Sequence, residues 1–224
     1  MGASMSVTGS CHLVTTEKHK FLLDCGQFQG SDEMDALNWQ EFAFDPAEID
    51  FMLLSHAHID HSGRIPLLVK RGFKGPIYCS DATADLLDIM LKDSASIQER
   101  DAEWKNRKNR RAGRPPVEPL YTTQDAIDAL KQVTPVLYDQ LLDLNGDVKA
   151  VFNDAGHVLG SSIIELFIAE NGDISKIVYS GDLGMRNKPI LRDPTIIKKA
   201  DFVIMETTYG NRVHEKNSTS IEKL

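Results

Sequence analysis

Four potential metal ligands lie within six consecutive positions of this chain. The string SHAHIDHSG, residues 55–63, contains His56, His58, Asp60 and His61, and it follows the apolar run IDFMLL, which is typical of a buried strand. His56 and His58 are two positions apart, and in extended backbone that spacing points both side chains to the same side. Two imidazoles can therefore converge on one cation, while Asp60 and His61 follow at the turn and can face a second position. Nitrogen and oxygen ligands without a thiolate favour zinc, and less selectively iron or manganese.

Two further residues of the same chemical type follow strand-like segments later in the chain. His157 lies in NDAGHVLGSS, after VKAVFN, and Asp182 lies in IVYSGDLGM. A carboxylate can bridge two cations through its two oxygens. Three strand ends that deliver histidine and aspartate therefore predict a site for two metal ions at one edge of a sheet. The alternative, a chance cluster on a solvated loop, does not readily explain four such residues in six positions.

The motifs HAHIDH, AGHVLGS and SGDLG resemble the metallo-β-lactamase superfamily. That resemblance implies an αβ/βα sandwich that binds two zinc ions between two β-sheets. One ion would be held by His56, His58 and His157, the other by Asp60 and His61, and Asp182 would bridge them. The resemblance also makes Asp24, in LLDCG, an acid that orients a ligand histidine, as metal sites commonly need. The alternative for Asp24 is a simple turn residue before a glycine.

Four more segments resemble the β-CASP branch of the superfamily, which processes nucleic acids. They are VTGSCHLV, LLDCGQFQG, DSASIQERDAEW with NRKNRRAG, and METTYGNR, and the resemblance covers nearly the whole chain. Glu206 matches the acidic residue that opens the β-CASP insert, where it hydrogen-bonds a catalytic histidine. The resemblance points to bacterial and archaeal RNA nucleases related to the cleavage-and-polyadenylation endonuclease, and it implies RNA as substrate and partner.

The β-CASP pattern also sets an expectation for domain organisation. Residues 1–208 correspond to the N-terminal part of a metallo-β-lactamase domain, and residues 209–224 to the start of the β-CASP insert. The family's closing motif with two more histidines is not found, since only His214 follows Glu206. We therefore expect an N-terminal piece of a longer nuclease, incomplete at the C-terminus and weakly active alone. An open sheet edge at DFVIMET, residues 201–207, and self-association would follow.

The ligand set predicts a mechanism. Two cations about 3.5–4 Å apart activate a water that attacks phosphorus, and they hold the developing charge. Asp60 orients this water, and Asp60 and Glu206 are the candidate catalytic residues. Endonuclease and 5′ exonuclease action both remain open. Two other functions also remain: a small-molecule metallo-hydrolase acting on a thioester or lactone, and a non-catalytic metal-binding fragment.

Composition is that of an ordinary cytoplasmic globular protein. The chain has 224 residues, 42% of them hydrophobic, and a net charge of −8. Neither a membrane-length apolar run nor an N-terminal signal pattern occurs, so we expect no membrane partner. The cysteines Cys11, Cys25 and Cys79 are odd in number and widely spaced, which argues for buried free thiols in a reducing compartment.

A basic segment stands out against the acidic background. Residues 101–114, DAEWKNRKNRRAGR, carry six lysines and arginines against two acids. Such a run can hold phosphates by releasing counterions, and Trp104 could stack on a base. We expect a phosphate track near the metal site, made by Lys105, Arg107, Lys108, Arg110 and Arg111. The alternative is a solvated loop.

The hydrophobic pattern predicts alternating strands and helices, and therefore an α/β fold. Expected strands are 11–16, 20–24, 49–55, 76–80, several over 136–182, and a buried strand at 201–207. Expected helices are a short one within 31–44, then 63–71, a long one from 81 capped by Asp81 or Thr83, 122–133, and 194–200.

Overall fold

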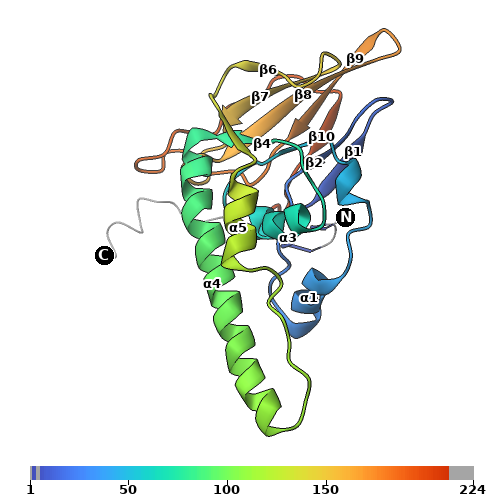
Figure 1. Ribbon diagram of the computed structural model, residues 1–224. Coiled ribbons are helices and arrows are strands. Elements are labelled where there is room, and N and C mark those ends of the chain that lie inside the picture. Colours follow the sequence, from blue (N-terminus) through green and yellow to red (C-terminus); the bar gives the residue numbers. More distant parts are fainter. Residues whose placement is uncertain (1, 4–5, 212–224) are drawn as a thin grey trace, which may run out of the picture.

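The computed structural model describes residues 2–3 and 6–211, so His214 and most of the expected insert lie outside the described residues. Two five-stranded sheets form the centre of the molecule (Figure 1). The first has the order β1-β2-β3-β4-β5, and all its neighbouring strands are parallel except β1 and β2. Its strands are His12–Thr15, Lys20–Leu23, Phe51–Leu53, Ile77–Ser80 and Val133–Val136.

The second sheet has the order β10-β9-β8-β7-β6 and is antiparallel except where β10 runs parallel to β9. Its strands are β6 Leu141–Asp143, β7 Val148–Asp154, β8 Ser162–Glu170, β9 Asp173–Tyr179 and β10 Phe202–Ile204. The connecting helices are α1 Asp32–Ala36, η1 Leu37–Trp39, η2 Pro46–Glu48, α2 Ile59–Ser62, α3 Ile65–Lys70, α4 Asp81–Arg111 and α5 Thr123–Leu130.

Helix boundaries follow from local chemistry. Ser80, rather than the expected Asp81 or Thr83, caps α4, because its hydroxyl accepts a hydrogen bond from the Thr83 N–H. Thr122 caps α5, in a reciprocal pair with Asp125. The chain leaves α3 at Gly72, whose φ of +114° disfavours other residues.

Strand alternation separates the interior into two main cores. In β3, Phe51 and Leu53 face the second sheet, while Met52 packs with α3, α4 and α5 on the other side. Phe152 of β7 and Ile164 of β8 complete the core between the sheets. The described residues thus form three layers, a helical layer and two sheets. These three layers agree with the expected α/β sandwich, and its fourth layer, a second set of helices, is not formed by the described residues.

Two expectations about the last described residues are wrong in part. Residues 194–200 form no helix but an irregular segment, in which Ile197 packs against a small cluster of Ala155, Ile163 and Val178. β10 is shorter than expected and is not buried, since Phe202 and Val203 are each about 60% exposed. As the last strand in its sheet, β10 does have an open, apolar edge, as predicted.

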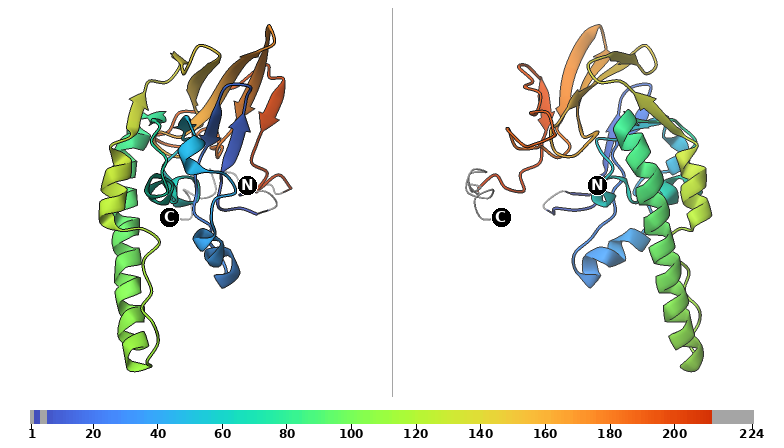
Figure 2. Two further views of the ribbon diagram at one scale, coloured as in Figure 1. Left: turned by 45° about the vertical axis from the view of Figure 1, so that its right-hand side comes forward. Right: turned by 90° about the vertical axis from the view of Figure 1, so that its left-hand side faces the viewer.

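Helix α4 is far longer than its neighbours, and its second half projects beyond the body of the molecule (Figures 1 and 2). The basic segment is therefore mainly helical, not a loop. At about 1.5 Å per residue, Lys105 lies about 36 Å along the axis from Asp81. The expectation that these cations lie near the metal ligands stays a prediction. Within the described part of the chain, no helix is both long and apolar enough to cross a membrane.

Candidate metal centre

The predicted ligands converge because three strands end at the same edge of the two sheets. His56 and His58 follow β3, His157 follows β7, and Asp182 follows β9. One ligand-capable atom from each of these four side chains lies within 4.8 Å of the others. A second group, made by Asp60, His61 and again Asp182, meets the same criterion. The structure therefore brings together all six residues expected at the metal site.

Distances within the first group fit a small central cation. His58 Nδ1 lies 3.0 Å from His56 Nε2 and 3.2 Å from His157 Nε2. Asp182 Oδ2 lies 3.7 Å from His56 Nε2 and 3.5 Å from His157 Nε2. Four ligands on a tetrahedron with metal–ligand distances of about 2 Å are separated by comparable distances. This group can hold one ion.

The second group shares Asp182. Its other carboxylate oxygen, Oδ1, lies 3.1 Å from His61 Nε2, and Asp60 Oδ2 lies 3.7 Å from the same nitrogen. Asp182 thus directs one oxygen to each group, which is the arrangement of a bridging carboxylate. Fewer protein atoms define this second position than the first.

The donor chemistry of the first group fits a cation better than it fits a protein hydrogen-bond network. Burial lowers the pKa of His56 to about 3, and burial also lowers the pKa of His157, so both rings are neutral at pH 7. His58 Nδ1 faces Nε2 of both of these rings. With their protons on the other ring nitrogens, all three imidazoles can direct a lone pair at one divalent cation.

Asp24 anchors the ligand loop from beneath. It is fully buried, and its carboxylate accepts hydrogen bonds from the Ser55 N–H at 2.7 Å and the Ser55 hydroxyl at 2.8 Å. It also accepts from the Tyr179 hydroxyl at 2.5 Å and lies 2.6 Å from His61 Nδ1. Because a carboxylate only accepts, the proton of His61 lies on Nδ1 toward Asp24, and Nε2 faces the second metal group.

Charge is distributed unequally over the centre. Burial disfavours the charged form of His61, but hydrogen bonds to Asp182 and Asp24 outweigh it and raise the pKa of His61 to about 10. Burial raises the pKa of Asp182, yet the His61 hydrogen bond and nearby imidazoles lower it to about 2. The same opposition leaves the pKa of Asp24 below its ordinary value. Without metal, His61 therefore carries the positive charge of the site between two carboxylates.

Glu206 lies beside this centre but not within it. Its carboxylate accepts a hydrogen bond from the Leu183 N–H at 2.7 Å, and its own N–H donates to the Ser180 hydroxyl. These contacts hold the loop that carries Asp182. Glu206 also lines a cavity of about 260 Å³ that reaches His61 and Asp182. The geometry makes Glu206 a support for the ligand loop.

Several residues that support the site were not anticipated from the sequence. Tyr179 and Ser55 bond Asp24, and the Ser10 hydroxyl lies 2.9 Å from that of Tyr179. Tyr179 lies 155 positions after Asp24, so no local pattern could link them. Ser55, next to His56, could have been noticed, because its hydroxyl lies 3.0 Å from His56 Nδ1.

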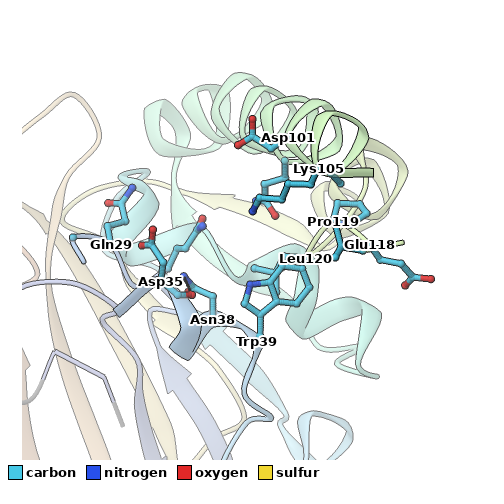
Figure 3. A pocket seen from close by; sticks show the side chains of 14 residues that line it. Gln29, Asp35, Asn38, Trp39, Asp101, Lys105, Glu118, Pro119 and Leu120 are labelled. Atoms are coloured by element: carbon cyan, nitrogen blue, oxygen red, sulfur yellow. Dashed lines mark hydrogen bonds between the residues drawn. The ribbon is translucent and has the colours of Figure 1, made fainter. Parts of the chain in front are cut away.

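A second cavity adjoins the ligand loop through Gln27, whose N–H donates to the Ile59 carbonyl. It measures about 840 Å³ and opens between η1, α4 and residues 117–120 (Figure 3). Of the residues in the basic segment, Lys105 lines it. None of the six metal-site residues does.

Comparisons with known proteins agree with this geometry. A family model described as Metallo-beta-lactamase superfamily matches residues 7–217. The chain is 40% identical to Ribonuclease TTHA0252 of Thermus thermophilus, over 95% of this chain and 44% of that protein. It is 33% identical to Transcription termination factor FttA of Methanosarcina mazei, over 94% of this chain and 31% of that protein. It is 31% identical to Cleavage and polyadenylation specificity factor 73 of Drosophila melanogaster, over 96% of this chain and 29% of that protein. The chain thus spans less than half the length of these curated relatives.

Proposed function

The chain belongs to the metallo-β-lactamase superfamily, as its metal motifs predicted, and we propose that it is a metal-dependent hydrolase that cleaves RNA phosphodiester bonds. The observation that carries the proposal is the convergence of six histidine and aspartate side chains into two groups sharing Asp182. The substrate class is supported by relatives named as a ribonuclease and as a cleavage and polyadenylation factor. Their names also support the β-CASP branch expected from METTYGNR.

We assign the first ion to His56, His58, His157 and Asp182, and the second to Asp60, His61 and Asp182. Zinc suits these nitrogen and oxygen donors, although iron and manganese share the preference. Bound there, two divalent cations would supply Lewis-acid activation of water and neutralise charge on a phosphodiester.

The chain's own residues have distinct tasks in this proposal. Asp24 keeps the proton of His61 on Nδ1, so that Nε2 stays available as a ligand. Asp60, partly exposed at the mouth of the site, orients the attacking water. Glu206 fixes the Asp182 loop through the Leu183 N–H, so we assign it a positioning role. We also propose that residues 1–208 are one domain and that 209–224 begin an insert.

A reducing compartment suits the cysteines. Cys11, Cys25 and Cys79 are free and buried in the structure. Burial raises the pKa of Cys79 to about 12, which keeps its thiol protonated and unreactive at neutral pH. We therefore place the protein in the cytoplasm.

The test is cleavage of an unstructured RNA under single-turnover conditions with the protein in excess, so that weak activity is detected. The metal-stripped chain should be inactive, and zinc or manganese should restore cleavage. His58→Ala should abolish activity with little loss of fold, because it removes a ligand at a strand end. The matched control is His19→Ala. It removes a histidine that pairs with Asp50 and is not one of the metal-site residues. RNAs labelled at the 5′ or 3′ end distinguish endonuclease from 5′ exonuclease action.

A panel of thioesters and lactones is assayed beside the RNA. Hydrolysis of these esters with no cleavage of RNA would contradict the proposal and support a small-molecule hydrolase. Tight metal binding with no hydrolysis of either class would support a non-catalytic metal-binding role.

A further inference from the structure

We propose that the projecting half of α4, with the 840 Å³ cavity beneath it, is an accessory binding surface for single-stranded RNA beside the loop that carries the metal ligands. The identity of the ligand rests on the proposed function. Phosphates would lie on the basic end of the helix, and an unstacked base would enter the cavity against Trp39. Charge, aromatic exposure and the cavity's donors and acceptors support this assignment.

The charge of the chain is strongly asymmetric. Six of its 25 lysines and arginines fall within residues 104–114, whereas all 33 acidic residues lie outside that range. Among the described residues, only one of the six cations, Arg107, pairs with a carboxylate, that of Glu103 at 3.7 Å. Lysines and arginines in the last turn complement the helix dipole, but that explains one or two of them rather than six. The remaining unpaired charge suits a polyanion.

Both tryptophans of the chain belong to this surface, Trp104 on α4 and Trp39 on the facing cavity wall, and they are 56% and 59% exposed. Trp104, Arg107, Lys108 and Arg111 follow i, i+3, i+4 and i+7 spacing and therefore share one helix face. The Lys108 ammonium lies 3.4 Å from the centre of the Trp104 ring. Aromatic rings interleaved with cations are the usual composition of surfaces that bind single strands.

The cavity itself suits an uncharged base rather than a phosphate. Figure 3 shows Trp39 on one wall and Asp101 and Lys105 of α4 on the opposite wall. Three carboxylates line the cavity against one lysine, so phosphate would be repelled. Gln27 also lines it, and its Oε1 is buried without a hydrogen-bond partner in the described structure. A base with N–H donors could satisfy Gln27 and Asp101 while stacking on the indole.

Hydrogen bonds hold this surface together, and its cavity adjoins the loop that carries the metal ligands. Asn106 exchanges two hydrogen bonds with the Val117 backbone, and Asn109 donates to the Pro115 carbonyl, so the returning chain is held along the helix. At its other end, α4 contacts the Gly160 carbonyl through Ser80 and Thr83, three residues after His157. Gln27 on the cavity wall donates its N–H to the carbonyl of Ile59, between the ligands His58 and Asp60, at 2.9 Å. One bound strand could therefore run from the cavity to the metal ligands.

The proposal is tested by RNA binding without cleavage. Fluorescence anisotropy is measured in EDTA with unstructured RNAs of 6 and 24 nucleotides over a range of salt concentrations. Arg107→Gln, Arg110→Gln and Arg111→Gln together should weaken binding of the 24-mer at least tenfold. They should also reduce the slope of log K against log salt by about 2, at about 0.7 per lost phosphate contact. The 6-mer has fewer phosphates to contact, so its salt slope should be smaller than that of the 24-mer.

A second variant isolates the cavity. Trp39→Ala should weaken binding of the 24-mer about tenfold or more without changing the salt slope, and Trp39→Phe should restore much of it. In a Trp104→Phe background, RNA should quench the remaining Trp39 fluorescence. The matched controls are Lys18→Gln, Lys131→Gln and Lys149→Gln together, which remove the same charge elsewhere, and Ile174→Ala, which truncates another exposed apolar residue.

Unchanged affinity and salt slope in the triple arginine variant would overturn the proposal. Unchanged affinity in Trp39→Ala would overturn its base-binding part. If the triple arginine variant kept its RNA binding but changed its self-association in light scattering, the surface would instead bind a second copy of the chain. That result would also overturn the proposal. None of these outcomes depends on catalysis. Failure of the proposed function would appear separately, as intact RNA binding with no metal-dependent cleavage.

Discussion

Replacement of Asp24 by asparagine should disable one metal position and leave the other in place. The carboxylate of Asp24 accepts hydrogen bonds from the Ser55 N–H, the Ser55 hydroxyl and the Tyr179 hydroxyl, and it pairs with His61. In Asp24→Asn, one oxygen becomes an amide NH₂ that can only donate. The hydroxyls can rotate to accept from it, but His61 must then move its proton from Nδ1 to Nε2. That proton would occupy the position of a metal ligand.

The magnitude follows from the burial of this pair. Removing one partner of a buried ion pair costs about 3–5 kcal/mol, and the isosteric asparagine with two adaptable hydroxyls keeps the loss near the lower end. We expect the free energy of unfolding of the metal-free chain to fall by about 2–3 kcal/mol at pH 7. Residues that orient a ligand histidine usually change metal affinity by about 10–100-fold. That loss should fall on the position of Asp60 and His61.

The assay is metal content by mass spectrometry after dialysis against graded chelator, together with urea unfolding of the metal-free chain. The wild type should hold a tighter and a weaker ion, and Asp24→Asn should keep the tighter one, held by His56, His58 and His157. Asp128→Asn is the matched control, because it removes a carboxylate that pairs with Lys131 at the surface. Equal affinity of both proteins for the second ion would refute the role of Asp24. Loss of both ions together would refute the division into two positions.

Three further predictions follow from the same geometry. The metal-free chain should lose up to about 5 kcal/mol of stability as pH rises from about 6.5 through 10. The reason is that protonated His61 stabilises the fold fully below its unfolded-state pKa of about 6.5 and no longer above its folded-state pKa of about 10. Urea unfolding in EDTA at several pH values would show this loss, and a flat profile would contradict it. Zinc uptake at pH 7 should release about one proton from His61, measurable with a pH indicator, and a release of none would be inconsistent with a protonated ligand. Gly26→Ala should displace the ligand loop, because a Cβ there would lie 1.6 Å from the Asp60 carbonyl; we expect about 1–3 kcal/mol lower stability and weaker metal binding, whereas Gly210→Ala, whose nearest contact is 3.3 Å, should change little.

Local sequence determined the ligands of the candidate centre. His56 and His58 follow an apolar run at a spacing of two, and His157 and Asp182 follow similar runs, so the sequence alone placed all four at strand ends. The structure places them within 4.8 Å because the strands end at one edge. Helices α4 and α5 were predicted for the same reason, since their apolar spacing and the Thr122 cap are local features.

Predictions failed where the outcome depended on what a segment packs against. Residues 194–200 have a helical composition but form an irregular segment, in which Ile197 packs on Ile163 and Val178 of the second sheet. Residues 202–204 have the apolar composition of a central strand, yet β10 is at the edge of its sheet and exposed.

The chemical types and the local order of the metal ligands were therefore determined by the sequence itself, since strand periodicity acts between near neighbours. The environment that tunes those ligands was decided only by tertiary structure. Asp24 and Tyr179 meet across 155 positions, and the pKa of His61 depends on two carboxylates that reach it from different strands. Burial and charge act through space, so side chains that are remote in sequence set the protonation of a residue whose identity the local motif had already revealed.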